Sequence, residues 1–191
     1  MKVVGISGSS RKNGNTAIII KTVFEELNNT GIETELIQLA DIDIQPCRAC
    51  FACKGKKNCV FRGDGFNDVF NRMVEADGII LCSPVYSADE SSKMQAFLDR
   101  GGVVVATNPG LLKHKVGASV AAVRRAGGMT AVDTMNHFML NKEMIVVGST
   151  YWNMVYGREI GDVLNDEEGM ANMRNLGQNM AWFLKRLDKQ G

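Results

Sequence analysis

The feature that most constrains the fold is the alternation of short apolar runs with amphipathic segments along the chain. The apolar runs predict five strands, at 2–6, 33–39, 78–82, 116–123 and 144–147. Because most of these runs are apolar on both faces, they indicate a parallel sheet covered by helices on both sides. Right-handed crossovers then favour a doubly wound α/β fold with the strand order 2-1-3-4-5.

The segments between the runs show helical spacing of apolar residues. They predict helices at 16–27, 66–76, 91–100, 131–140 and about 167–187, the third one ending at Gly101-Gly102. With 191 residues, 45% of them hydrophobic, the chain suits a single domain, 1–191. Two insertions interrupt the pattern: a cysteine loop at 46–60 and a long irregular stretch at 148–164.

The charge balance and the apolar runs exclude several classes of function. The 22 Lys and Arg against 21 Asp and Glu give a net charge of +1, so we expect neither nucleic-acid nor membrane binding. The first apolar run is shorter than a signal peptide requires, and no run approaches a membrane span. We therefore expect a cytoplasmic protein with reduced thiols, in which clustered cysteines indicate metal binding or catalysis.

The turn after the first strand, 7–16, is rich in hydroxyl and amide side chains and leads into a helix. Such a turn suits a phosphate group, with Arg11 supplying charge. It is not a P-loop, because Gly8 and Gly14 are one residue too far apart and Asn15 replaces the lysine. A dinucleotide-binding glycine motif is also absent. The alternative is an ordinary polar turn with Asn15 or Thr16 as the helix N-cap.

Two further turns follow strands whose carboxyl ends meet at the same edge. After the third strand, Pro84, Val85, Tyr86 and Ser87 offer apolar and aromatic surface for a planar ring, unless Tyr86 only packs on its neighbours. After the fourth strand, Arg124, Gly127 and Gly128 allow close backbone approach to a ligand, unless they form a solvated basic turn. Together the three turns favour a planar cofactor with a phosphate tail.

The cysteines divide into four plus one. Cys47, Cys50, Cys53 and Cys59 form a C-x2-C-x2-C-x5-C pattern, similar to the ferredoxin run that holds a [4Fe–4S] cluster. Zinc and unliganded thiols are the alternatives, although structural zinc more often uses two separated cysteine pairs. The fifth, Cys82, follows an apolar run and is expected to be a buried core thiol.

These segments together resemble the iron–sulfur flavoproteins, within the wider NADPH-dependent FMN reductase and flavodoxin-like group. The resemblance covers 4–16, 46–59, 77–100 and 124–128. It implies that FMN phosphate lies on the first turn, at Ser7, Ser9, Arg11, Asn15 and Thr16. It further implies that the flavin ring lies on Pro84–Ser87 and is bordered by Gly127 and Gly128, with the four cysteines holding a [4Fe–4S] cluster nearby.

The expected function is that of an FMN-dependent oxidoreductase of a flavodoxin-like fold. Electrons would pass from ferredoxin or NAD(P)H to a small-molecule acceptor, no catalytic acid or base is required, and the resemblance implies a homodimer or homotetramer. The alternatives are a non-enzymatic electron carrier and a zinc-stabilised binding protein. Asp89 and Glu90 are unusual for the family and are expected to make the site more negative. The apolar stretch 152–156 is expected to cover a neighbouring subunit's flavin or to pack locally.

Overall fold

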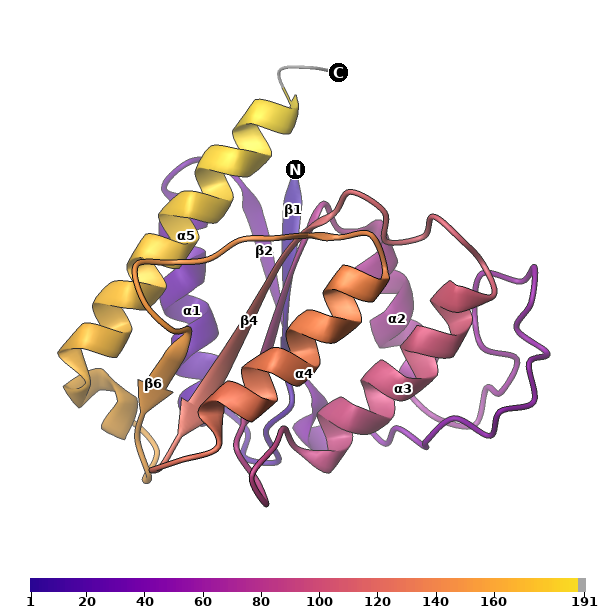
Figure 1. The fold of residues 1–191 in the computed structure, drawn as a ribbon, viewed down its shortest axis with the longest axis horizontal. Helices are drawn as coiled ribbons and strands as arrows, with labels where there is room; N and C mark the ends of the chain where they lie inside the picture. The colour runs from indigo at the N-terminus through magenta and orange to yellow at the C-terminus, as the bar shows by residue number, and fades with distance from the viewer. Residues whose placement is uncertain (189–191) are drawn as a thin grey trace.

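The computed structural model describes residues 1–188, which are built around one parallel sheet (Figure 1). The strand order is β2-β1-β3-β4-β5, and β6 pairs with β4 beyond the end of β5. The strands are β1 (Lys2–Ser7), β2 (Glu33–Gln38), β3 (Gly78–Pro84), β4 (Val116–Val123), β5 (Ile145–Val146) and β6 (Met154–Tyr156). The predicted flavodoxin-like fold and strand order are confirmed.

Helices cover both faces of the sheet. They are α1 (Asn15–Asn28), α2 (Phe66–Glu75), α3 (Ser92–Ala106), α4 (Gly128–Asn141) and α5 (Glu167–Asp188), with short 3-10 turns η1 (Leu39–Asp41) and η2 (Asp162–Asn165). Figure 1 shows α1 and α5 together on one side, with α3 and α4 on the other. None of the helices in the described residues is both long enough and apolar enough to cross a bilayer.

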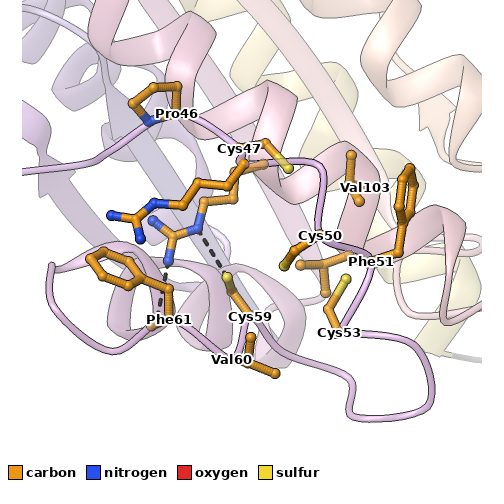
Figure 2. A pocket seen from close by; sticks show the side chains of 12 residues that line it. Pro46, Cys47, Cys50, Phe51, Cys53, Cys59, Val60, Phe61 and Val103 are labelled. Carbon is orange, nitrogen blue, oxygen red and sulfur yellow. Dashed lines mark hydrogen bonds between the residues drawn. The ribbon is translucent and has the colours of Figure 1, made fainter.

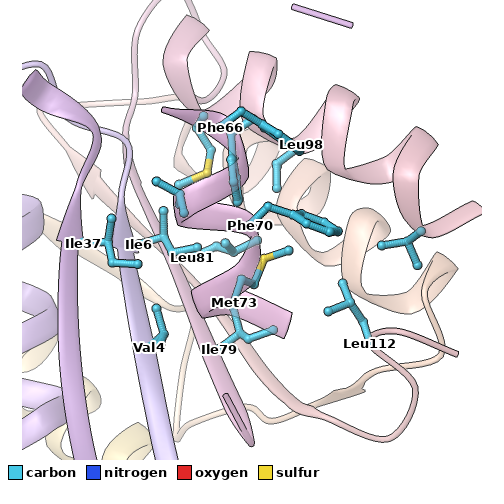
Figure 3. Close-up of a cluster of buried hydrophobic side chains, with 14 of the residues drawn as sticks. Val4, Ile6, Ile37, Phe66, Phe70, Met73, Ile79, Leu81, Leu98 and Leu112 are labelled. Carbon is cyan, nitrogen blue, oxygen red and sulfur yellow. The ribbon is translucent and has the colours of Figure 1, made fainter. Parts of the chain in front are cut away.

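The alternation of side chains along the strands explains the two faces. On β1, Val3 packs with α1 and α5, whereas Val4 and Ile6 point to the cluster under α2, α3 and α4 (Figure 3). The cluster under α2, α3 and α4 also contains the stacked rings of Phe66 and Phe70, whose centroids are 5.3 Å apart. Full burial on both faces is why the strand sequences read as continuous apolar runs.

Helix α3 corrects one sequence prediction. It runs through Gly101-Gly102 and ends only at Ala106, because Val104 and Val105 after the glycines are buried in the core. Burial of two valines outweighs a helix penalty of about 1 kcal/mol per glycine. Helix α4 likewise begins at Gly128, three residues before the predicted start.

The stretch 148–164 is less irregular than predicted. Its strand β6 is three residues long, too short for a periodic signal, yet Val155 is fully buried against α5 and η2 residues. Trp152 and Tyr156 on either side remain about half exposed. The stretch therefore packs locally through Val155 and leaves aromatic side chains on the surface.

Candidate functional site

A cavity of about 380 Å³ opens at the carboxyl ends of β1, β3 and β4. We call it the edge cavity. Its lining residues are Ser9, Arg11, Asn15, Thr16, Pro84, Val85, Tyr86, Ala122, Arg124, Gly157, Arg158 and Glu159. The structure thus brings most of the residues predicted on the three turns to one place. Three arginines against one glutamate make the cavity suitable for an anionic group.

The first turn is held by hydroxyl groups. Ser7 Oγ and Thr16 Oγ1 lie 2.7 Å apart in a buried hydrogen bond, which joins the end of β1 to the start of α1. The backbone N–H of Arg11 donates to Ser9 Oγ at 3.0 Å. Ser7 is therefore a support behind the cavity, while Ser9 and Thr16 reach its surface.

Asn15 does not cap the helix. The N-cap is Gly14, which makes no side-chain cap bond, so the N-cap interpretation of Asn15 or Thr16 is wrong. Instead, Asn15 Nδ2 donates to the carbonyl of Glu159 at 2.9 Å, and Asn15 Oδ1 accepts from the N–H of Gly161 at 2.8 Å. The side chain ties the 157–161 segment to the first turn.

The 157–161 segment is the part of the edge cavity that sequence reasoning missed. Arg11 Nη1 donates to the carbonyl of Arg158 at 3.1 Å, which adds a second tie. The N–H of Gly157 donates to the carbonyl of Val123 at 2.8 Å and places the segment beside β4. No local pattern signals the ties to Arg11 and Asn15, because they join residues more than 140 positions apart.

The turn after β3 is a tight hairpin. Tyr86 and Asp89 exchange backbone hydrogen bonds, and Ser87 and Ala88 between them have φ values of 49° and 73°. Both φ values lie in the left-handed region, as a two-residue hairpin turn requires. Tyr86 is 41% exposed at the cavity mouth, whereas Ser87 is exposed and lies outside the cavity lining.

The two glycines after β4 pack behind the cavity rather than lining it. Gly127 has φ 83°, and a Cβ there would meet Val85 Cγ1 at 2.8 Å and Ala88 backbone atoms at 3.1 Å. Gly127 therefore lets the turn after β4 lie directly against the turn after β3. A Cβ on Gly128 would meet Met154 Sδ, so glycine there lets β6 lie close to the start of α4.

Asp89 and Glu90 are expected to make the site more negative, and the surroundings of Glu90 bear on that expectation. Glu90 is 6% exposed, and neither carboxylate oxygen has a hydrogen-bond partner among residues 1–188. Burial, together with neighbouring Asp89, raises the pKa of Glu90 to about 8. The pKa of Asp89 is lowered by its contacts with Glu90 and Thr134. At neutral pH the pair therefore carries close to one negative charge rather than two.

All four clustered cysteines line a second, mainly apolar cavity between the 46–61 loop and α3 (Figure 2). We call it the thiol cavity. Its other lining residues are Pro46, Arg48, Phe51, Val60, Phe61, Arg100, Val103 and Val104. Cys53 is buried, Cys47 and Cys59 are half-buried and Cys50 is exposed. The cavity measures only about 30 Å³, room for one or two waters.

The sulfur atoms share this cavity without the close spacing of ligands around one ion. Within the part of the chain that the structure describes, no three His, Cys, Asp or Glu side chains form a group that could hold a single metal ion. The donor set still suits an iron–sulfur cluster, which takes thiolates and spreads them over several irons. Holding a cluster would require the 46–60 loop to adjust.

Side chains from the neighbouring helices anchor the cysteine loop. Asn67 of α2 pairs with both backbone groups of Cys59, at 3.1 Å each. Asn108, just after α3, donates to the carbonyl of Cys53 at 3.0 Å and accepts from the N–H of Lys57 at 2.9 Å. The loop itself includes left-handed residues at Ala49, Phe51 and Lys57. Its shape therefore depends on these anchors more than on regular structure.

Two predictions for the cysteines remain: that Cys82 is a buried core thiol, which is confirmed, and that a cluster lies near a flavin. Cys82 is fully buried in β3, and burial raises the pKa of its thiol, as a core cysteine requires. The edge cavity and the thiol cavity share no lining residue. That a cluster lies near a flavin stays a prediction.

Known proteins resemble this chain in sequence and in fold. The family model for NADPH-dependent FMN reductase matches residues 1–159. An iron–sulfur flavoprotein of Methanocaldococcus jannaschii is 38% identical over 99% of this chain and 100% of its own length. Another, from Methanosarcina thermophila, is 36% identical over 78% of each chain.

Among solved structures, RosB with a bound intermediate has a TM-score of 0.80 at 16% identity, covering 99% of this chain and 81% of its own. At this identity the likeness concerns the fold alone. The sequence matches show the family as well as the fold, because the family model spans 1–159 and the 38% identical relative spans nearly the whole chain. This chain belongs to the iron–sulfur flavoproteins of the NADPH-dependent FMN reductase family.

Proposed function

We propose that the protein is an FMN-dependent oxidoreductase that also holds a [4Fe–4S] cluster. The observation that carries the proposal is the edge cavity, which joins a cationic, hydroxyl-rich turn to an apolar and aromatic turn at one sheet edge. A phosphate-tailed planar cofactor needs this combination. When bound, FMN supplies one- and two-electron redox chemistry, and a [4Fe–4S] cluster supplies single-electron transfer.

The residues of the first turn would hold the phosphate. Ser9, Thr16 and the N-terminal N–H groups of α1 offer hydrogen-bond donors, and the α1 N-terminus favours negative charge. Arg11 is exposed at the cavity and is held by the carbonyl of Arg158. Asn15 would act indirectly, by fixing the 157–161 wall.

The second and third turns would hold the ring. Pro84, Val85 and Tyr86 give it an apolar face, and Arg124 lies on the same cavity. A guanidinium beside the pyrimidine edge would stabilise an anionic reduced flavin. Gly127 would keep the two turns in contact behind the ring, and Gly128 would leave room for Met154 of β6 beside them. No side chain of the edge cavity is required as an acid or base.

We place the cluster on Cys47, Cys50, Cys53 and Cys59, since these thiols line one cavity. The proposed donor is ferredoxin or NAD(P)H, and the proposed acceptor is a small molecule. The half-exposed Trp152 and Tyr156, next to cavity residue Gly157, support a homodimer or homotetramer in which a second copy covers this rim.

The experiment that tests the site assignment is Cys50→Ser in anaerobically prepared protein. We expect it to abolish the cluster absorbance and leave FMN bound, because Cys50 belongs to the thiol cavity alone. The matched control is Cys82→Ala, which removes a core thiol and should retain both signals. If Cys50→Ser retains the cluster, the ligand assignment is wrong.

Rapid-mixing reduction with NADH, NADPH and reduced ferredoxin then identifies the donor. Steady turnover of a small acceptor is expected for an enzyme. Reduction followed only by electron transfer to another protein would instead indicate a carrier.

A further inference from the structure

Arg100 is a buried cation beside the thiol cavity that the proposed function does not use. Its side chain is 3% exposed, and its partner Asp64 is 0% exposed, with Nη1 and Oδ2 2.5 Å apart. A buried charge needs a partner, and the cost of breaking such a pair is high. The pair therefore fixes the end of the Arg100 side chain.

Two further guanidinium N–H groups are also occupied. Nη1 reaches the carbonyl of Gln45 at 3.3 Å, and Nη2 donates to the carbonyl of Phe61 at 3.1 Å. Asp64 in turn accepts from the backbone N–H of Gln45 at 2.8 Å. The planar guanidinium is thus held in one orientation by residues at the two ends of the cysteine loop, Gln45 and Phe61.

The Nε–H group points at a cysteine. Arg100 Nε donates to Cys59 Sγ at 3.2 Å, the bond drawn to Cys59 in Figure 2. The other arginine on the cavity, Arg48, stacks over the Phe61 ring at 4.3 Å and makes no hydrogen bond to a cysteine sulfur among residues 1–188. Only one of the two arginines therefore acts directly on a proposed ligand.

We propose that Arg100 is a positioning residue that holds Cys59 Sγ toward the thiol cavity and raises the reduction potential of the cluster bound there. This inference rests on the proposed function. A charge-assisted N–H bond to a ligating sulfur stabilises the more negative, reduced cluster, and such bonds are among the factors that set cluster potentials. An anchor that only braced the loop would leave the potential unchanged.

The test compares Arg100→Lys with Arg48→Lys in reconstituted protein. Both keep the charge, but only Arg100→Lys removes the fixed Nε–H. In a redox titration followed by electron paramagnetic resonance, we expect Arg100→Lys to shift the one-electron equilibrium about tenfold toward the oxidised cluster, which is 59 mV. Arg48→Lys should stay close to the parent. Arg100→Lys with a full cluster and an unchanged potential would overturn the proposal.

A second measurement needs no cluster and applies even if Arg100→Lys fails to retain one. In metal-free protein we expect one arginine Nε–H nuclear magnetic resonance signal that is protected from solvent exchange. It should be absent in Arg100→Lys, shifted in Cys59→Ala and unchanged in Arg48→Lys. If Cys59→Ala leaves it unshifted, the Arg100–Cys59 bond does not exist and the inference fails. If the parent binds no iron at all, the proposed function fails instead.

Discussion

The edge cavity and the thiol cavity are built by different means. The edge cavity, about 380 Å³, is walled by the ends of paired strands, which are tied through backbone groups such as Val85 N–H to Ala122 carbonyl. The side chains of Arg11 and Asn15 add only the 157–161 segment to this wall. The thiol cavity, about 30 Å³, lies in a loop held by the side chains of Asn67, Arg100 and Asn108.

Each site therefore gets its shape from a different source. A sheet edge is rigid before any ligand arrives, so a cofactor there finds its walls in place. A loop held by a few side chains takes its final shape together with what its thiols bind, as metal sites commonly do. The two sites should therefore respond differently to single substitutions.

The largest effect is expected for Asp64→Ala, which tests the dependence of the loop on side-chain anchors. The substitution leaves Arg100 buried without its partner and removes an acceptor for two backbone N–H groups. We expect the free energy of unfolding to fall by about 3–5 kcal/mol. The measurement is the urea unfolding midpoint.

Asp68→Ala is the control for this prediction. Asp68 also pairs with an arginine, Arg72, but its side chain is 74% exposed. An exposed pair contributes less than about 1 kcal/mol. Similar losses in the two variants would show that the loop does not depend on the buried pair.

A smaller effect is expected for Glu90→Gln, at a buried carboxyl that follows the turn after β3. The pKa of Glu90 is about 8, above its ordinary value of 4.5, so the folded protein binds the proton more tightly than the unfolded chain. Stability from this group is therefore complete below pH 4.5 and is lost as the pH rises toward 8, with a slope of at most about 1.4 kcal/mol per pH unit.

Glu90→Gln removes this titration. Between pH 6 and pH 8, the variant should lose about 2 kcal/mol less free energy of unfolding than the parent, measured in urea at each pH. Parallel pH profiles for the two proteins would show that Glu90 is ionised in the folded state, contrary to its burial.

The smallest effect on stability is expected for Gly127→Ala, which tests whether backbone contact between turns sets the edge cavity. A Cβ at this left-handed position would press on Val85 and Ala88. We expect a loss of about 1–2 kcal/mol in the free energy of unfolding. The affinity for FMN, from fluorescence titration, should fall about tenfold.

Gly110→Ala is matched for strain, with φ 89° but no atom within 4 Å of the added Cβ. It should cost about 1 kcal/mol and leave FMN affinity unchanged. Equal FMN affinity in the two variants would show that the contact of the turn after β4 with the turn after β3 does not shape the edge cavity.

The contrast between the two cavities also explains which parts of the fold and of the two sites could be predicted from the sequence. The fold and the meeting of Arg11, Tyr86 and Arg124 at one edge follow from apolar runs, because the carboxyl ends of parallel strands lie together. The C-x2-C-x2-C-x5-C spacing indicated a shared thiol site. The ties from Asn15 to Glu159 and from Arg100 to Cys59 could not be predicted, since each depends on tertiary packing between distant residues.

The most direct test of the central claim is the iron, sulfide, zinc and flavin content of protein prepared and reconstituted without oxygen. We expect four iron and four sulfide per chain on the thiols, together with one FMN in the edge cavity. Zinc on the cysteines with no flavin would contradict it.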